Sequence, residues 1–377
     1  MSNKTINYIR GDAVITVSLC MIVKNEQDTI GRCLESVKDI VDEIIIVDTC
    51  SSDRTREIAG AFTSKIFDFE WIDDFSAARN YSFSKATMNY ILWLDADDVI
   101  LDEDRTKFNK LKEVLNPSVD IVVMQYNVGF DEKGNVAMSF YRERLFRRAT
   151  DFVWNDPIHE YISLSGNIAC VDICITHKKM HPQTGRNLRI FEKIISEGRE
   201  LSVRNLFYYA RELLYNERID DAILYFNKFL DTEQGWAENK ISACNDLAKC
   251  YMIKNERRNA LKTMLRSFEY GIPRAELCCQ IGYYYLAANE FKTAAFWFEL
   301  ATRLKKPEYN LGFLLHDFWG YIPYMELCVC HFRMGNIEES KKYNDKAAEY
   351  KADDPSVLYN KRYFASISVN AKNDTIP

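Results

Sequence analysis

The sequence predicts an α/β domain with a mixed, mainly parallel sheet, followed by an all-α domain of helical repeats. Two observations lead to this prediction. In the first half of the chain, short β-branched runs alternate with amphipathic stretches, the order that is typical of layered α/β domains. After Gln183 the chain becomes helical, and a pattern of two helices recurs along it. We therefore expect a first domain at 1–185, a repeat domain at 186–365 and a tail at 366–377.

The composition is that of a folded protein, and it restricts the partners. Of the 377 residues 47% are hydrophobic, enough to build a sizeable core. The net charge of -6 and the pI near 5.6 argue against a general nucleic-acid surface, because phosphate attraction needs clustered Lys and Arg. The first residues lack the apolar stretch of a signal peptide, and no window approaches the roughly 18 apolar residues of a membrane span. We expect a cytoplasmic protein without a transmembrane segment.

The cysteines agree with a reducing compartment. There are 11 of them, an odd number, and several lie among apolar neighbours, as reduced core thiols do. Their spacing lacks the paired C-x-x-C pattern of a zinc knuckle, so we do not expect structural zinc.

The strands and helices of the first domain can be placed in order. The predicted strands are short runs of β-branched and aromatic residues without a helical period, at 14–23, 42–48, 65–71 and 89–96. The predicted helices between them cover 26–40, 51–62 and 73–86. Two of these helices begin with good N-cap residues, Ser-Ser-Asp in one and Asp-Asp in the other. In sheets of this kind, ligands bind at the carboxyl ends of the strands.

From about Asn116 the sequence pattern changes, and longer runs typical of extended strands appear. Residues 120–148 contain a hairpin turn at Glu132-Lys133-Gly134-Asn135, and short extended pieces follow at 152–162 and 167–180. We predict that this part is an antiparallel annex that completes the site.

The second half of the chain repeats. Four short linkers each join an aromatic-rich helix to a second helix, at 217–222, 255–260, 289–294 and 335–340. Each linker ends in a small residue, and the intervals between these small residues are 38, 34 and 46. The pattern resembles tetratricopeptide repeats, in which small residues let paired helices pack closely into a solenoid. An ordinary helical bundle stays open as the alternative.

A run of acids follows the strand YILWL. The strand delivers Asp95 and Asp97, with Ala96 between them, to its carboxyl edge. Clustered carboxylates disfavour one another's charge unless a cation joins them, and a hard divalent ion with oxygen ligands is the simplest partner. The alternative is that such acids cap the next helix. We expect Asp102 to Asp104 to cap the next helix in this way. For Asp95 and Asp97 both explanations, a cation site and helix capping, stay open.

The stretch from Val17 to Asp98 resembles the family 2 glycosyltransferases. Four pieces match in the family's order: SLCMIVKNEQDTIGRCLESV, DEIIIVDTCSSDRTREIA, WIDDFSAARNYSFSKAT and YILWLDADD. The resemblance covers about the first 190 residues and implies a GT-A-like, nucleotide-sugar-binding fold. With its repeat tail the chain is also similar to the bacterial glycosyltransferases that include the sublancin-type peptide S-glycosyltransferases.

The resemblance implies a metal site. Asp95, Ala96 and Asp97 match the family's Asp-x-Asp motif, whose carboxylates hold Mn²⁺ or Mg²⁺ against the diphosphate of the donor. His177 follows the last strand and matches the late His that completes the site. His159 is the alternative for that role.

Further residues match positions around the donor. Val23, Asn25 and Glu26 follow the first strand and match residues that line the ribose and base. Asp48 matches the acceptor of the uracil imide, and capping of its own loop is the alternative. Arg79 matches an Arg near the diphosphate, whose planar fork can bind two phosphate oxygens.

Two alternatives concern side chains that the resemblance places near the chemistry. Pairing with Asp73 or Asp74 stays open for Arg79. Inverting transfer needs a base on the face opposite the leaving group, and Glu160 in DPIHEYI is our candidate. For Glu160 the alternative is that it only orients the acceptor.

The resemblance and the repeats together imply a metal-dependent, inverting glycosyltransferase. The donor would be a UDP-sugar, UDP-glucose or UDP-N-acetylglucosamine, and the acceptor a protein or peptide presented by the repeats, which also suit a homodimer. One alternative is an enzyme of cell-surface polysaccharide or lipid-linked glycan synthesis. Another is a non-catalytic repeat scaffold with a degenerate nucleotide-sugar-binding domain. A nucleotidyltransferase would need a Gly-rich loop near the first strand, and VSLCMIVKNE has no glycine.

Overall fold

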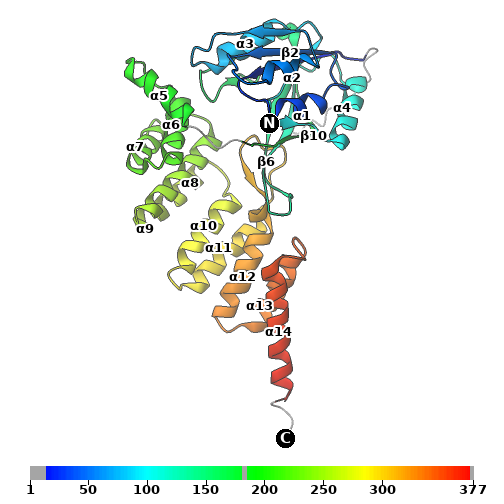
Figure 1. Ribbon diagram of the computed structural model, residues 1–377. Helices are drawn as coiled ribbons and strands as arrows, with labels where there is room; N and C mark the ends of the chain where they lie inside the picture. The colour runs from blue at the N-terminus through cyan, green and yellow to red at the C-terminus, as the bar shows by residue number, and fades with distance from the viewer. Residues whose placement is uncertain (1–13, 181–184, 374–377) are drawn as a thin grey trace. The chain divides into compact units, whose positions relative to one another are not determined.

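The computed structural model describes residues 14–180 and 185–373. The start of the predicted first domain, the stretch 181–184 and the last four residues of the predicted tail lie outside these ranges. The chain divides into two compact units (Figure 1). The first unit contains Met1–Lys193 and Tyr309–Leu314, and the second contains Ile194–Glu308 and Leu315–Pro377.

A nine-stranded mixed sheet forms the centre of the first unit, in the order β3-β2-β1-β4-β7-β6-β10-β5 with β11 paired to β7. Its strands are β1 (Val17–Val23), β2 (Glu43–Asp48), β3 (Ile66–Asp68), β4 (Tyr90–Trp93), β5 (Asp98–Val99), β6 (Ile121–Phe130), β7 (Val136–Arg147), β10 (Ile168–His177) and β11 (Leu314–Leu315). Strands β1 to β4 pair in parallel, as does β10 with β6. The predicted fold class is confirmed.

Helices cover both faces of this sheet, so the unit has three layers. On one face, α1 (Ile30–Glu35), α2 (Thr55–Gly60) and α4 (Asp102–Val114) contribute to the larger apolar core. On the other face, α3 (Phe75–Ser84) packs over a core rich in aromatic residues, which includes Trp93 and Trp154. The observed α1 is shorter than the predicted helix at 26–40. The expectation that Asp102 to Asp104 begin a helix is confirmed.

The predicted annex is not separate from the main sheet. The hairpin of β6 and β7 forms with its turn at 131–135, as expected. However, β7 also pairs with β4, so that Leu145, Phe146 and Arg147 lie opposite Leu92, Ile91 and Tyr90. The short pair β8 (Trp154–Asn155) and β9 (Tyr161–Ile162) stands alone as a second sheet. The antiparallel strands therefore extend the parallel ones in one continuous layer.

A distant segment also belongs to the first unit. Asn310 accepts a hydrogen bond through its carbonyl oxygen from the backbone N–H of Tyr141, at 2.8 Å. Tyr309 packs against the ring of Tyr141 with centroids 5.2 Å apart, and Phe313 packs against Phe140 at 4.7 Å. The connection between α11 (Phe291–Arg303) and α12 (Tyr321–Arg333) thus covers β7 of the sheet.

The second unit is all-helical, as predicted. Its helices are α6 (Val203–Tyr215), α7 (Ile219–Leu230), α8 (Ala237–Ile253), α9 (Arg257–Arg266), α10 (Ala275–Leu286), α11 (Phe291–Arg303), α12 (Tyr321–Arg333), α13 (Ile337–Ala348) and α14 (Pro355–Asn373), and α5 (Arg186–Ser196) crosses the border between the units. They follow one another in chain order, each in contact with the next (Figure 1). Among the described residues, none of the helices combines the length and the apolar character that a bilayer crossing requires.

Four helix pairs share one turn geometry, which is direct evidence of a repeat. The first helix of each pair is followed by a residue with left-handed backbone, at Glu217, Asn255, Asn289 and Gly335. In each pair the next backbone N–H donates to the carbonyl oxygen five residues earlier, at 2.8 to 3.0 Å. This is the Schellman closure of a helix end. The four predicted linkers therefore have the same backbone geometry, which confirms that they are equivalent positions of a repeat.

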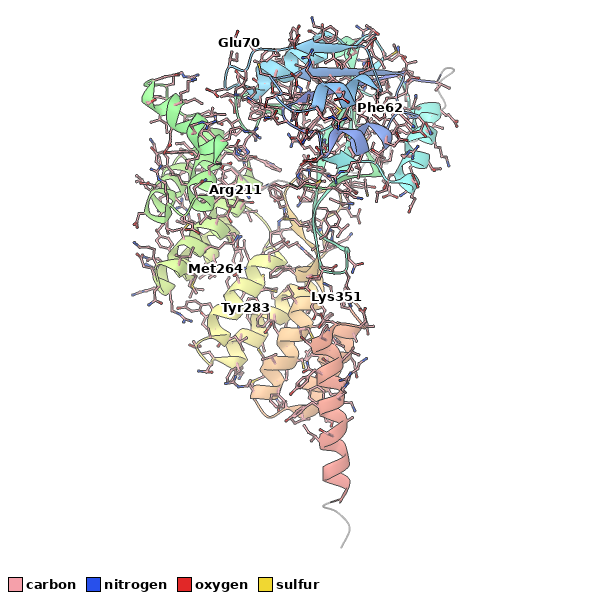
Figure 2. All side chains as sticks on the ribbon, viewed as in Figure 1. Phe62, Glu70, Arg211, Met264, Tyr283 and Lys351 are labelled. Carbon is pink, nitrogen blue, oxygen red and sulfur yellow. The ribbon has the colours of Figure 1, made fainter. Side chains whose placement is uncertain are left out.

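Small residues let the paired helices approach. Ala222, Ala260, Ala294 and Ser340, which end the four linkers, are all fully buried. Around them lie larger apolar side chains such as Met264 of α9, labelled in Figure 2. One close approach is at Gly282 of α10, where a Cβ would lie 2.7 Å from the ring of Phe298 on α11.

We expect Gly282→Ala to destabilise the helical unit. Alanine favours a helix by about 1 kcal/mol over glycine, but the added methyl would collide with a buried ring. Overpacking of this kind costs roughly 1–3 kcal/mol. The measurement is urea unfolding followed by circular dichroism. The control is Gly271→Ala, whose new Cβ would meet Ile241 at an ordinary 3.6 Å. Equal unfolding midpoints for both variants would show that the helices separate easily at Gly282.

Candidate active site

A cavity of about 690 Å³ lies at the carboxyl ends of the first unit's strands. It brings together nearly all of the side chains that the sequence singled out. The predicted residues that line it are Val23, Asn25, Glu26, Arg79, Asp95, Ala96, Asp97, His159, Glu160 and His177. Asp48 is the exception, because it lies beneath the cavity wall while its neighbour Thr49 faces the cavity.

Asp98 fixes the loop that carries the predicted metal ligands. Its side chain is fully buried and forms an ion pair with the equally buried Arg144 at 3.0 Å. It also accepts hydrogen bonds from the Tyr126 hydroxyl at 2.7 Å and from the backbone N–H of Asp95 at 3.1 Å. Burial and the charge of Asp98 raise the pKa of Tyr126 well above its usual value, so the phenol stays a donor. The loop from Asp95 to Asp98 is therefore held at both ends.

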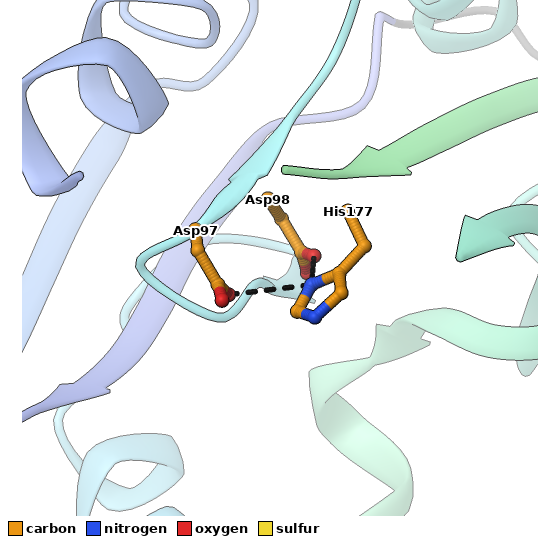
Figure 3. Close-up of side chains that lie close together, drawn as sticks. All are labelled: Asp97, Asp98 and His177. Carbon is orange, nitrogen blue, oxygen red and sulfur yellow. Dashed lines mark hydrogen bonds and ion pairs between the residues drawn. The ribbon is translucent and has the colours of Figure 1, made fainter. Parts of the chain in front are cut away.

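Strand pairing brings His177 to the same loop. In the antiparallel register of β10 and β5, His177 lies directly opposite Asp98. Its Nδ1 is 3.1 Å from a carboxylate oxygen of Asp98 and 3.3 Å from one of Asp97 (Figure 3). Burial lowers the pKa of His177, but hydrogen bonds and charge from the two carboxylates outweigh burial and raise it to about 10.

Asp97, Asp98 and His177 could hold a metal ion. Their oxygen and nitrogen atoms all lie within 4.8 Å of one another. Two carboxylates and an imidazole suit Mn²⁺ and, less specifically, Mg²⁺. Asp98 already binds Arg144 and Tyr126, whereas Asp97 has no such buried partners in the part of the chain that the structure describes. Among the described residues, His159 is not part of this group.

Arg79 connects the loop from Asp95 to Asp98, here called the metal loop, to Glu160, the predicted base. Its Nη2 donates to Asp95 at 2.8 Å and its Nε to Glu160 at 2.7 Å. The guanidinium is almost completely buried and lies over the rings of Trp93 and Trp154, at 4.5 and 5.2 Å. The structure therefore pairs Arg79 with two carboxylates that differ from the Asp73 and Asp74 considered from the sequence.

Those two acids have other partners. Asp74 is the N-cap of α3 and accepts from the backbone N–H of Ala77 at 2.9 Å. Asp73 binds Lys193 at 2.6 Å.

The network sets the charge of Glu160 and Asp95. Burial raises the pKa of the Glu160 carboxyl, but the charges of Arg79 and Arg142 outweigh burial and leave its pKa below the usual value. The same balance of burial against Arg79 and Arg144 lowers the pKa of Asp95. Both groups are therefore carboxylates at neutral pH, and the position of Glu160 depends on Arg79.

The loop that carries Glu160 is tied to α3. The side chain of Asn80 exchanges two hydrogen bonds with the backbone of Trp154, at 2.8 and 3.0 Å. At the start of α3, the backbone N–H of Phe75 donates to the carbonyl oxygen of Pro157 at 2.9 Å. Because Arg79 also belongs to α3, this one helix positions both Glu160 and its cationic partner.

The predicted nucleotide end is built from the loops after β1 and β2. Asn25 accepts from the backbone N–H of Ser52 at 2.8 Å, and the backbone N–H of Glu26 donates to Thr55 at 2.7 Å. Asp48 uses one carboxylate oxygen for Arg56 and the backbone N–H of Ser51. Its other oxygen, Oδ1, is buried and has no hydrogen-bond partner among the described residues.

Sequence reasoning missed the aromatic and basic residues that surround Trp93. Three guanidinium groups lie over its ring, those of Arg79, Arg142 and Arg144, at 4.5, 4.6 and 4.0 Å. Arg142 and Arg144 share one face of β7, because side chains alternate along a strand. Two arginines two residues apart, flanked by apolar and aromatic residues in the strand FYRERLF, were the available signal.

The comparison with known proteins agrees with this geometry. Residues 18–165 match the family model described as glycosyl transferase family 2. A TPR repeat-containing protein of Synechococcus elongatus is 40% identical over 152 residues, which cover 40% of this chain and 36% of that protein. The SPbeta prophage-derived glycosyltransferase SunS of Bacillus subtilis is 32% identical over 231 residues, 57% of this chain and 53% of that protein. The matches thus span about half or less of these relatives' length.

Among solved structures, the C-terminal part of a TPR repeat-containing protein of Cytophaga hutchinsonii is 15% identical, with a TM-score of 0.40 over 50% of this chain and 66% of that one. The family match itself falls on the strands and helices that build the cavity, from Ser18 in β1 to beyond Glu160. Residues 18–165 of this chain are therefore similar to glycosyl transferase family 2, and paired helices follow them.

Proposed function

We propose that the protein is an inverting glycosyltransferase that moves a sugar from a UDP-sugar to a protein or peptide. One observation supports this most. A carboxylate-histidine group and a carboxylate-arginine-carboxylate network around the buried Arg79 share one cavity in the part of the chain that matches family 2. UDP-glucose and UDP-N-acetylglucosamine are the proposed donors. All eleven cysteines are free, which supports a cytoplasmic location.

We propose that Asp95, Asp97 and His177 hold Mn²⁺ or Mg²⁺. When bound, the ion would offset negative charge on the leaving diphosphate as a Lewis acid. The short distance between Asp97 and His177 supports their joint role. Asp98 keeps this group in place through Tyr126 and Arg144.

Glu160 is the proposed base. An acceptor hydroxyl or thiol must lose its proton as it attacks, and an ionised carboxylate at the cavity wall can take it. Arg79 keeps Glu160 ionised and oriented, but a carboxylate with a lowered pKa is also a weaker base. Orientation of the acceptor by Glu160 is therefore the second proposal for this residue.

The nucleotide is proposed to lie against Val23, Asn25 and Glu26. The unpaired buried oxygen of Asp48 supports recognition of a donor such as the uracil imide N–H, because an orphaned buried acceptor is costly. Thr49, which follows Asp48, already faces the cavity.

The acceptor is proposed to bind the helical unit. Repeated helix pairs form extended surfaces that suit peptides and protein segments. The alternatives are polysaccharide or lipid-linked glycan acceptors, or a scaffold without turnover. Mass spectrometry of the full chain with Mn²⁺, several UDP-sugars and candidate peptides separates them. A peptide that gains one sugar mass supports the proposal, and a scaffold would neither modify a peptide nor hydrolyse a UDP-sugar.

We expect Asp97→Asn to remove metal-dependent UDP-sugar hydrolysis while the protein stays folded. Metal charge contributes several kcal/mol to such reactions, so the rate should fall by roughly 100-fold or more. The thermal melt should move by only a few degrees, because Asp97 has few buried partners. The matched control is Asp172→Asn, an exposed carboxylate on the same strand as His177. Full activity of Asp97→Asn would exclude Asp97 as a metal ligand.

We expect Glu160→Gln to slow UDP-sugar hydrolysis by about 100- to 10,000-fold if Glu160 is the base. Binding of UDP should stay within a few-fold, because the amide keeps the shape of the side chain. The measurements are hydrolysis rates and calorimetric UDP titrations on the same preparations. A loss confined to transfer onto a peptide, with hydrolysis intact, would instead support the orienting role.

A further inference from the structure

Two arginines of the cavity wall, Arg142 and Arg186, contact an aromatic ring and have no carboxylate partner among the described residues. Arg142 of β7 lies over Trp93 at 4.6 Å, and its one hydrogen bond is a long one, 3.5 Å, to the carbonyl oxygen of Glu160. Arg186 of α5 lies over the ring of Phe75 at 4.6 Å. In both cases the ring holds the flat face of the guanidinium, so that the N–H groups at its edge stay available.

This arrangement is pre-organised for an anion. Holding a long cation in place usually costs side-chain entropy, which the ring contact has already reduced. Lys24, Lys179 and Arg189 also line the cavity, but no ring contact is found for their side chains in the part of the chain that the structure describes.

Arg79 differs from Arg142 and Arg186 because it is paired with carboxylates, although it matches the family position near the diphosphate. Two of its nitrogens donate to Asp95 and Glu160, and the side chain is almost completely buried between two indole rings. A cation already offset by two carboxylates has little net charge to offer a third anion. Releasing it would leave the largely buried carboxylate of Glu160 without its cationic partner, which is strongly destabilising.

Arg186 lies within electrostatic range of both parts of the site. The surrounding cavity wall lowers its pKa by desolvation, and the carboxylates of Glu160, Glu26 and Asp95 act in the opposite direction. Glu26 belongs to the nucleotide end, and Asp95 to the metal loop. Arg186 therefore stands where the anionic link between nucleotide and sugar has to pass.

We propose that Arg142 and Arg186 bind the diphosphate of the donor, and that Arg79 is a positioning residue acting through Asp95 and Glu160. The inference rests on the proposed function, since it takes a nucleoside diphosphate as the ligand. Each guanidinium can hold two phosphate oxygens, and together they supply two positive charges to the leaving group. Arg186 lies beyond residues 18–165, so the helix after the family 2 match completes the donor site.

The test compares UDP with uridine, which lacks the phosphates, by calorimetry on the full-length protein with Mg²⁺. Arg142→Gln and Arg186→Gln should each weaken UDP binding by about 10- to 100-fold, the value of a charge-assisted hydrogen bond. Uridine binding should not change. Arg148→Gln is the matched control, because Arg148 binds Asn89 at the amino end of β4, whereas the cavity lies at the carboxyl ends of the strands.

The role of Arg79 has its own readout. Arg79→Lys keeps the charge but loses the fork, so UDP affinity should stay within about threefold while kcat of hydrolysis falls at least tenfold. The inference is overturned if both glutamine variants bind UDP as the native protein does, or if Arg79→Lys alone loses the preference for UDP over uridine. Failure of the native protein to bind UDP at all would instead refute the proposed function, and the inference with it.

Discussion

The ion pair between Asp98 and Arg144 is the interaction on which the candidate site depends. Neither side chain is exposed, and each carries a charge that would be costly without the other. The carboxylate of Asp98 also accepts hydrogen bonds from the Tyr126 hydroxyl and from the backbone N–H of Asp95. The acids that face the cavity therefore need not hold the loop, and Asp97 stays available for a ligand.

The arginines around Trp93 also differ in whether a carboxylate neutralises them. The indole packs against Arg79, Arg142 and Arg144, which occupy three different electrostatic situations. Arg144 is neutralised by Asp98, and Arg79 by Asp95 together with Glu160. Among the residues that the structure describes, the guanidinium of Arg142 makes one long hydrogen bond, to the carbonyl oxygen of Glu160, and no ion pair. Cation-π contacts contribute only about 0.5–2 kcal/mol each, so the partner carboxylates decide which arginine can meet a substrate.

Much of this molecule could be predicted from its sequence, because the informative signals were local. Period and capping located the sheet, the helix at Asp102 and the four helix pairs, and family motifs placed Asp95, Asp97, Glu160 and His177 around one cavity. The partners of those residues could not be predicted, since they depend on long-range pairing. Antiparallel pairing of β4 with β7 brings Arg142 and Arg144 to Trp93, and no local pattern encodes that register.

The segment Tyr309–Leu314 belongs to the first unit, although in sequence it lies between two helices of the repeat region. Phe313 packs on Phe140, Phe140 packs on Tyr126 at 5.5 Å, and Tyr126 binds both Asp98 and His177. A loop between two helices of the repeat region thus forms the outer layer of a stack that ends at the proposed metal ligands. Packed aromatic rings transmit displacement because they cannot be compressed. A chain that ends before Tyr309 would therefore lack part of the packing behind the site, although it would keep the cavity residues themselves.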